Sequence, residues 1–302
     1  MTPTDTRDLG HGGSRRQRGS RPGSVTGYSH QHDISHCSTA PEVRPDDAPV
    51  LRLVGMLVGM ASSPHRPLEL EFGPELGLFL APRDRSAEPG RGGIVRVRAD
   101  GTSTIGHVVE AAGVPLPEVG SLLVNGTPVQ PSHQPASGDR ILVGAISRPQ
   151  SLPEPRFLLD VHLGALARRM RLVGLDTAYS NDLDDDTLIE LANSGRRLLL
   201  TKDRGLLRRR RLWLGAYVRG DRADEQLSDV LDRFGPALEP WTRCMVCNGE
   251  LRPAPKEEVA AQLLPGTRRT YQEFSRCAVC GRVYWRGAHS RRLARIVAAA
   301  TG

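Results

Sequence analysis

Hydrophobic and polar positions divide the chain into stretches with different periods. Residues 1–65 are rich in glycine, serine, arginine, proline and histidine, and they show no sustained apolar period before a short run at 50–60. Such a stretch cannot offset the entropy of ordering by burial. We therefore expect it to be disordered, or to be an extension included because the start codon is assigned too early. Met56 and Met60 lie close to the point where the folded pattern begins.

Short strands with turn residues follow over residues 66–147. The pair Asn125-Gly126 after the third strand is the strongest short signal for a hairpin. Between the second and third strands, the pattern predicts a helix that is capped by Ser103 and ends at Gly113. The order strand, strand, helix, strand, strand is that of an α+β β-grasp domain. The predicted strands are Leu68–Phe72, Ile94–Val97, Leu122–Val124 and Ile141–Val143.

Beyond a proline-punctuated linker at 148–155, strands alternate with helices, which predicts an α/β domain with a parallel sheet at 156–240. The helix Leu163–Val173 has apolar residues at core spacing and ends at Gly174. The other predicted elements are strands at Arg156–Leu159, Thr177–Tyr179, Leu198–Thr201 and Ala216–Val218, and helices at Thr187–Ala192 and Asp224–Phe234. We expect the last residues, 293–302, to form a tail.

Acidic residues follow two of these strands and open one of the helices. Asp160 follows the first strand of the α/β domain, Asp203 follows the third, and Asp184–Asp186 open the helix between them. Because the carboxyl ends of parallel strands line one edge of a sheet, we expect these side chains to converge there. Clustered carboxylates need a cation to neutralise them, and hard oxygen ligands suit Mg²⁺ or Mn²⁺. Either ion can activate a water molecule for attack on a phosphodiester.

Each of these acids also has a structural alternative. Asp184 or Asp185 could be an ordinary helix N-cap, since an acidic side chain there accepts hydrogen bonds from free backbone N–H groups. Asp160 could cap a helix beginning near Leu163, and Asp203 could cap the next helix. Capping does not require the acids to meet at one sheet edge, and the metal hypothesis does.

Four cysteines near the C-terminus form two C-x-x-C pairs, Cys244 with Cys247 and Cys277 with Cys280. This spacing is typical of a structural zinc site with four thiolate ligands, and it predicts a zinc ribbon at 241–292. The alternatives are two disulfides or four unrelated buried thiols. No N-terminal segment resembles a secretory signal that would favour oxidation. Cys37 is left without a role.

The charge of the chain points to a polyanionic partner. The net charge is +7, and all of the excess lies in residues 151–302, which carry 26 Lys and Arg against 19 Asp and Glu. Nearly all of the basic residues are arginines, whose planar fork pairs with phosphate, and they cluster at Arg208–Arg211. A GC-rich coding sequence is the alternative source of arginine. No apolar run is long enough to span a membrane, so we expect a soluble, cytoplasmic protein.

Several segments of the second half carry a more specific pattern. They are Phe157–Thr177, Asp185–Ala192, Leu199–Arg204, Glu225–Leu227, Arg243–Asn248 and Cys277–His289. Together they resemble the Mut-seven C-terminal RNase family, a PIN-like nuclease group. The resemblance implies a PIN-like fold, acidic residues that hold a divalent metal, and RNA as the substrate. It carries the metal role to Asp160, Asp186 and Asp203, with Asp185 as the alternative to Asp186.

A second resemblance concerns the β-grasp segment. The matching residues are Gly113-Val114-Pro115, Glu118-Val119, Val124-Asn125-Gly126 and Gly138-Asp139. They resemble the ubiquitin-like domain found beside certain prokaryotic nucleases, which is itself similar to sulfur carriers that act through a free C-terminal Gly-Gly. Here the chain continues after Ser147, so docking of a protein partner or a scaffold role is expected rather than sulfur transfer.

The combined hypothesis is an Mg²⁺- or Mn²⁺-dependent ribonuclease. Lys202 and Arg204 would position phosphate, with Arg204 as the preferred clamp, and Trp285 and His289 of the ribbon would contact single-stranded RNA. A surface ion pair for Arg204 and burial of Trp285 are the alternatives. A non-catalytic RNA-binding or ribosome-associated adaptor is the competing function. In a third reading, the β-grasp domain is the main functional part and docks a partner protein.

Overall fold

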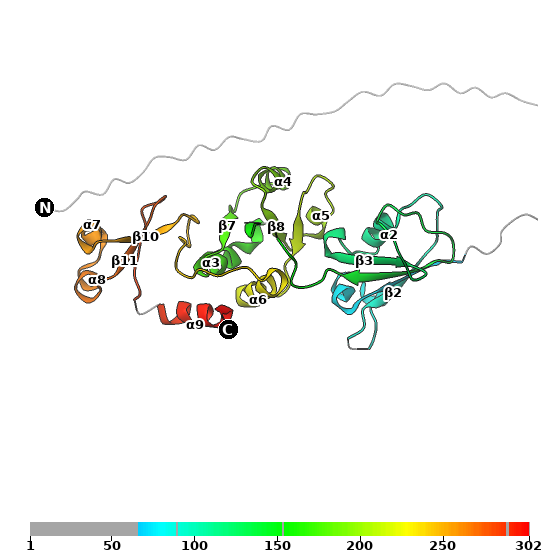
Figure 1. Cartoon of the computed structure of the whole chain (residues 1–302), viewed down its shortest axis with the longest axis horizontal. Helices are drawn as coiled ribbons and strands as arrows, with labels where there is room; N and C mark the ends of the chain where they lie inside the picture. The colour runs from blue at the N-terminus through cyan, green and yellow to red at the C-terminus, as the bar shows by residue number, and fades with distance from the viewer. Residues whose placement is uncertain (1–65, 89, 153, 288–289, 302) are drawn as a thin grey trace, which may run out of the picture. The chain divides into compact units, whose positions relative to one another are not determined.

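The computed structural model describes residues 66–88, 90–152, 154–287 and 290–301 (Figure 1). The expected N-terminal extension and His289 lie outside the described residues.

The first described domain is a five-stranded mixed sheet in the order β2-β1-β5-β3-β4, which confirms the β-grasp expectation. Strand β1 (Leu68–Phe72) pairs parallel with β5 (Arg140–Ala145), and the other pairs are antiparallel. Helix α2 (Ile105–Ala111) packs its buried residues into the core on one face of this sheet. The remaining elements are β2 (Gly93–Val97), β3 (Val119–Val124), β4 (Thr127–Pro128) and the 3-10 helices η1 (Pro74–Phe79), η2 (Pro82–Asp84) and η3 (Leu116–Glu118).

The cap of α2 differs from the expected one. Thr104, not Ser103, accepts the hydrogen bond from the backbone N–H of His107, at 3.4 Å. The hydroxyl of Ser103 instead donates to Asp100 Oδ2 at 2.6 Å. The turn that begins at Asp100 therefore occupies Ser103 and moves the helix start by one residue.

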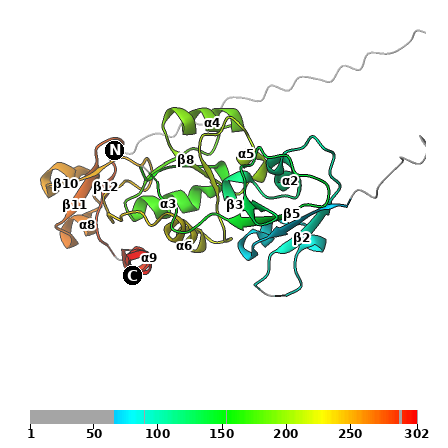
Figure 2. The ribbon, with the colours of Figure 1, turned by 45° about the vertical axis from the view of Figure 1, so that its right-hand side comes forward.

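The second domain is built on a four-stranded parallel sheet in the order β7-β6-β8-β9. The two central strands, β6 and β8, are almost entirely apolar because helices cover both faces of the sheet, as Figure 2 shows for β8 between α3 and α4. Phe157 and Leu159 of β6 enter the core under α3 and α6, whereas Leu158 enters the core under α4. The elements are β6 (Arg156–Leu159), η4 (Val161–Leu163), α3 (Gly164–Leu172), β7 (Asp176–Tyr179), α4 (Asp185–Ser194), β8 (Leu198–Thr201), α5 (Arg204–Leu207), β9 (Gly215–Tyr217) and α6 (Ala223–Phe234).

The cysteine segment forms a small antiparallel sheet in the order β10-β11-β12. Its own core is small and contains Val259, Leu263 and Phe274. A core of this size supplies little stability, so a metal or a neighbouring domain has to contribute the rest. The elements are β10 (Leu251–Ala254), α7 (Lys256–Val259), η5 (Ala260–Gln262), α8 (Pro265–Thr270), β11 (Phe274–Cys277) and β12 (Val283–Tyr284).

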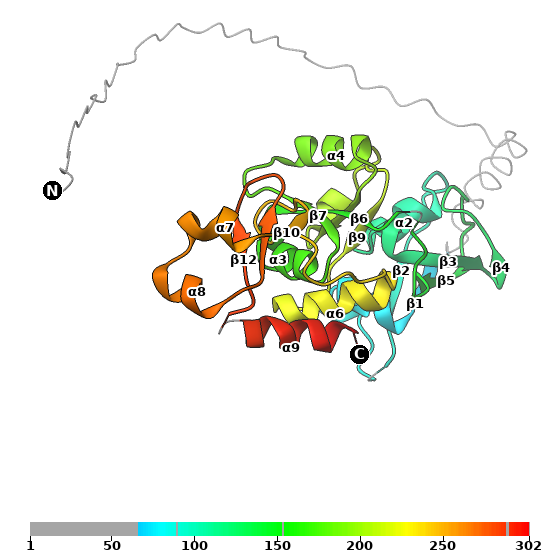
Figure 3. The same cartoon turned by 60° about the vertical axis from the view of Figure 1, so that its left-hand side comes forward.

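Residues at the C-terminus form a helix, α9 (Ser290–Thr301), where a tail was expected. Ile296, Val297 and Ala300 recur at three- and four-residue spacing and pack against the core under α3 and α6. Figure 3 shows α9 lying along α6. The apolar side of this short helix is therefore covered by the second domain, a tertiary effect that propensity alone does not predict.

Candidate active site and metal centre

The topology of the parallel sheet has a switch point between β6 and β8. The chain leaves β6 for β7 on one side and later returns to β8 on the other side, so the loops after β6 and β8 diverge. In open α/β sheets, ligands bind at this switch point, at the carboxyl ends of the strands. Asp160 directly follows β6, and Asp203 lies two residues after the end of β8. Both acids therefore lie at the edge where the sequence placed them.

One buried hydroxyl bonds both to the carboxylate of Asp160 and to the backbone of Asp203. Thr201, the last residue of β8, is fully buried, and its Oγ1 donates to Asp160 Oδ2 at 2.6 Å. The same oxygen accepts a hydrogen bond from the backbone N–H of Asp203 at 2.8 Å. The sequence analysis missed Thr201, although a polar residue that closes an otherwise all-leucine strand is a signal that could have identified it.

Asp160 is buried and has no cationic partner among the described residues. The residue is only 8% exposed, and in the described part of the chain no Lys or Arg forms an ion pair with its carboxylate. It also makes no side-chain cap bond to the turn that follows. The capping alternative therefore does not account for Asp160. A buried carboxylate with one neutral donor is costly unless a cation compensates it.

Asp203 has a structural role as well as a place at the edge. Its Oδ1 accepts hydrogen bonds from the backbone N–H groups of Gly205 at 2.6 Å and Leu206 at 3.4 Å, so it caps α5. Among the described residues, no hydrogen bond is made to Oδ2. The cap orients the carboxylate and leaves one oxygen for another ligand.

The acids of α4 have arginine partners. Asp184 is the N-cap, and hydrogen bonds from Thr187 hold the pKa of its carboxyl below the usual value. Asp185 lies 3.7 Å from Arg209, and Asp186 lies 2.5 Å from Arg211. In the described residues, these acids do not meet Asp160 closely enough for three of them to reach one ion. Mg²⁺ is often held by one or two carboxylates with water and substrate phosphate, so a preformed triad is not required.

The expected phosphate-binding residues have different surroundings. The Nζ of Lys202 donates to the carbonyl of Gly220 at 2.8 Å and pairs with Asp221 at 2.9 Å, close to the same sheet edge. The guanidinium of Arg204 instead donates to two carbonyls of the β-grasp domain, so its fork is occupied and is not directed at a phosphate. Trp285 is 42% exposed, and its ring lies tilted against that of Phe274, with centroids 6.5 Å apart and planes at 56°.

The four cysteines form a cluster that fits a tetrahedral ion. Their sulfur atoms all lie within 4.8 Å of one another, and all four thiols are free. The sulfur atoms of Cys244 and Cys280 are 3.7 Å apart, and those of Cys247 and Cys277 are 3.4 Å apart. Zinc–sulfur bonds of about 2.3 Å in a tetrahedron place the sulfurs about 3.8 Å apart. A common centre for all four sulfurs favours one structural zinc site over two disulfides.

Neighbouring donors set the protonation of the cluster. Burial opposes ionisation of Cys244, but hydrogen bonds from Tyr284 and from the backbone of the knuckle outweigh it and lower the pKa to about 6. Burial raises the pKa of Cys247 to about 12, and its bonds to the other thiols add to this. One sulfur is therefore ready as the thiolate that a metal binds.

The first cysteine knuckle is fastened to the edge of the parallel sheet. Arg171 is 4% exposed, and its Nη1 donates to the carbonyls of Met245 at 3.2 Å and Val246 at 2.8 Å. Its Nε donates to the carbonyl of Thr177 in β7. The backbone N–H of Thr177 donates in turn to Asn248 Oδ1. The ribbon is thus bonded to β7 through side chains rather than through a strand ladder.

Comparison with protein families identifies both parts of the chain. Residues 155–297 match the Mut7-C RNAse domain, and residues 66–151 match the Mut7-C ubiquitin domain. The chain thus contains a Mut7-C RNAse domain preceded by a Mut7-C ubiquitin domain. The expected nuclease family and its ubiquitin-like domain are therefore confirmed. No curated protein and no solved structure gives a significant match.

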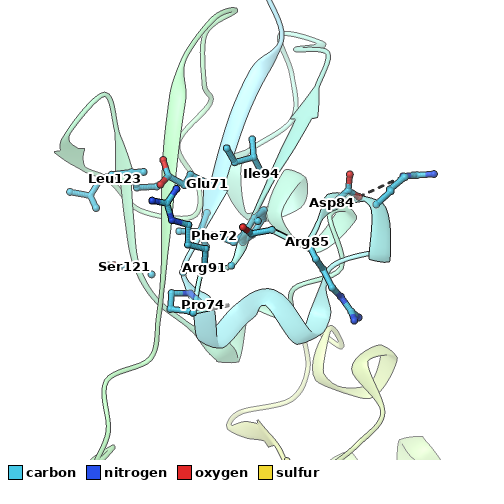
Figure 4. Close-up of a pocket in the computed structure, with 18 residues that line it drawn as sticks. Glu71, Phe72, Pro74, Asp84, Arg85, Arg91, Ile94, Ser121 and Leu123 are labelled. Atoms are coloured by element: carbon cyan, nitrogen blue, oxygen red, sulfur yellow. Dashed lines mark ion pairs between the residues drawn. The ribbon is translucent and has the colours of Figure 1, made fainter. Parts of the chain in front are cut away.

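The Mut7-C ubiquitin domain carries a cleft of about 710 Å³ on the outer face of its sheet. Figure 4 shows Glu71, Ile94 and Leu123 on the strands around it, with the segment that carries Arg91 alongside. None of the candidate acids of the Mut7-C RNAse domain lines this cleft. It is therefore separate from the candidate active site. Within the described residues, no helix is long and apolar enough to cross a membrane.

Proposed function

We propose that the Mut7-C RNAse domain is a divalent-metal-dependent ribonuclease in which Asp160 and Asp203 hold Mg²⁺ or Mn²⁺, and that Asp186 or Asp185 becomes a further ligand only when the start of α4 moves toward them. The observation that carries this proposal is the buried carboxylate of Asp160, without a cationic partner among the described residues, at the sheet's switch point. The family match to an RNAse domain supports RNA as the substrate.

The residues around this sheet edge have different roles in the proposed reaction. Thr201 fixes the carboxylate of Asp160 and the backbone of Asp203 with one hydroxyl, so that both acids keep their orientation. A bound divalent cation would lower the pKa of an attacking water and stabilise the leaving oxygen. Lys202 lies beside this edge and supplies positive charge for a phosphate.

The arginine run after α5 is a second source of phosphate contacts. Arg209 and Arg211 are more than half exposed and pair with acids at the start of α4. These exposed pairs contribute little stability, so an RNA phosphate can replace the carboxylate at small cost. In this arrangement, release of the arginines would also free Asp185 and Asp186 for a cation.

An RNA cleavage assay with Mn²⁺ tests the proposal. Asp160→Asn and Asp203→Asn should each lose at least about 100-fold in cleavage rate, because a metal ligand is lost while the shape is kept. Asp184→Asn is the matched control, since asparagine caps a helix as well as aspartate and no catalytic role is given to Asp184. Cleavage by Asp160→Asn at the parent rate would reject the proposal.

A non-catalytic RNA-binding adaptor is the second candidate function. It is favoured by the structural partners of three acids, since Asp203 caps α5 while Asp185 and Asp186 pair with arginines. In that case the parent would bind RNA without cutting it in Mn²⁺ or Mg²⁺. RNA binding measured beside cleavage, on the same preparations, separates the two functions.

A further inference from the structure

We propose that the Mut7-C ubiquitin domain positions the active-site loop through Arg204, which acts as a positioning residue for Asp203. This inference rests on the proposed function, because it gives Asp203 a role in holding the cation. It assigns the ubiquitin domain an intramolecular task at the nuclease site, in addition to any protein partner that its free surface binds.

Arg204 reaches across the boundary between the two domains. Its Nη1 donates to the carbonyl of Phe79 at 2.7 Å, and its Nη2 donates to the carbonyl of Leu78 at 3.0 Å. The guanidinium also lies over the Phe79 ring, 5.1 Å from its centroid. Both carbonyls belong to the end of η1, so the planar fork engages one rigid turn at two points.

The position of Arg204 makes this anchor relevant to the candidate site. It is the first residue of α5, directly after Asp203, and α5 contains only four residues. A helix this short has no stability of its own, because the cost of its first turn is not recovered by propagation. Its position is therefore set by contacts at its ends, namely the Asp203 cap, the buried side chains of Leu206 and Leu207, and the Arg204 anchor.

The surface that receives Arg204 is itself held firmly. Phe79 packs edge-on against Tyr217 of β9, with ring centroids 5.0 Å apart. The backbone N–H of Tyr217, on the outer edge of β9, donates to Glu118 Oε1 of the ubiquitin domain at 2.8 Å. Glu118 also forms a fully buried ion pair with Arg233 at 2.7 Å. The ubiquitin domain thus covers the edge strand of the nuclease sheet and presents η1 to Arg204 as a fixed support.

The test compares two variants of the full-length, zinc-loaded protein. One is Arg204→Ala, and the other replaces an arginine at the opposite, amino-terminal end of the parallel strands. Arg197→Ala is the control, since Arg197 donates to both oxygens of Asp176 and to the carbonyl of Phe157, at the amino ends of β6 and β7. Arg204→Lys keeps the charge but loses the fork. The readouts are the Mn²⁺ concentration for half-maximal RNA cleavage, hydrogen exchange of the backbone amides in α5, and the unfolding midpoint.

We expect Arg204→Ala to raise the half-maximal Mn²⁺ concentration by about tenfold and to speed exchange of the Gly205 and Leu206 amides by about the same factor. Arg204→Lys should give an intermediate value for both. Arg197→Ala should lower the unfolding midpoint while the Mn²⁺ dependence and the exchange in α5 stay as in the parent. Equal Mn²⁺ dependence in Arg204→Ala and the parent would overturn the inference.

Failure of the inference can be told apart from failure of the proposed function. If the parent protein neither cleaves RNA nor binds Mn²⁺, the proposed function fails, and the positioning role fails with it. If the parent cleaves RNA but Arg204→Ala leaves the Gly205 and Leu206 amides as protected as in the parent, only the inference fails. An Arg204→Ala protein that unfolds before assay is replaced by Arg204→Lys, for which parent values in both readouts contradict the inference.

Discussion

The buried ion pair between the two domains gives a prediction with a calculable size. Arg233 and Glu118 have side chains that are 1% and 0% exposed, and they approach to 2.7 Å. Replacement of Arg233 by Met keeps much of its volume but leaves the Glu118 carboxylate without a cationic partner. Removal of one member of a buried pair costs about 3–5 kcal/mol, because the remaining charge stays desolvated.

The structure indicates that this site lies at the upper part of that range. Glu118 Oε2 is already buried without a hydrogen bond among the described residues, and Oε1 would keep only the N–H of Tyr217. Arg233 also donates to Gln150 at 3.0 Å and to the carbonyl of Pro117 at 3.2 Å, and these bonds are lost with the guanidinium. For a folded unit of this size, a loss of about 4–5 kcal/mol corresponds to a fall in melting temperature of roughly 8–20 °C.

Thermal and urea unfolding of the zinc-loaded protein measure this effect. The double variant Arg233→Met with Glu118→Met removes both charges, and it should recover more than half of the loss, because no uncompensated charge remains. A melting temperature for Arg233→Met within about 2 °C of the parent would refute the reasoning, since it would correspond to at most about 1 kcal/mol. It would mean that the interface between the domains is not closed in solution.

Three further predictions concern the site, the ribbon and acid stability. Thr201→Val should lower RNA cleavage about 10–100-fold with a loss of about 1–3 kcal/mol in stability, measured by cleavage rate and urea unfolding. Purified protein should contain about one zinc per chain by metal analysis, and Cys277→Ser should contain almost none. Burial opposes ionisation of Asp176, but hydrogen bonds from Arg197 and Asn248 outweigh it and keep the pKa of this carboxyl below its usual value. The ionised carboxylate therefore stabilises the fold above about pH 4, and this stabilisation is lost as the pH falls through the folded-state pKa. The stability of Asp176→Asn, measured by urea unfolding, should depend less steeply on pH in the acid range.

Local patterns were sufficient for the two central strands of the parallel sheet, but not for the C-terminal helix α9 or the cap of α2. The strands Arg156–Leu159 and Leu198–Thr201 have the predicted bounds, because a short apolar run between turn residues has one stable solution in a covered parallel sheet. The parallel direction of the strands was also predictable, from the alternation of strands and helices along the chain. These features depend on residues that are close together in the sequence, so the sequence pattern is enough to predict them.

Long-range side-chain partners were not predictable in the same way. Arg204 and its acceptor Phe79 are separated by 125 positions, and nothing in the sequence around Arg204 distinguishes a domain anchor from a phosphate clamp. Arg171 and the knuckle carbonyls present the same problem, since a buried arginine and a solvated one look alike in sequence. The position of Asp160 at the sheet edge was predictable from topology, whereas its link to Thr201 required the packed structure.

Direct binding of Mn²⁺ tests the central claim of a hard cation at the edge formed by Asp160 and Asp203. We predict that the zinc-loaded parent binds Mn²⁺, measured by the loss of the free-ion electron paramagnetic resonance signal, and that Asp160→Asn weakens this binding by at least about 30-fold while the zinc content is unchanged. Mn²⁺ binding by Asp160→Asn as tight as that by the parent would contradict the account.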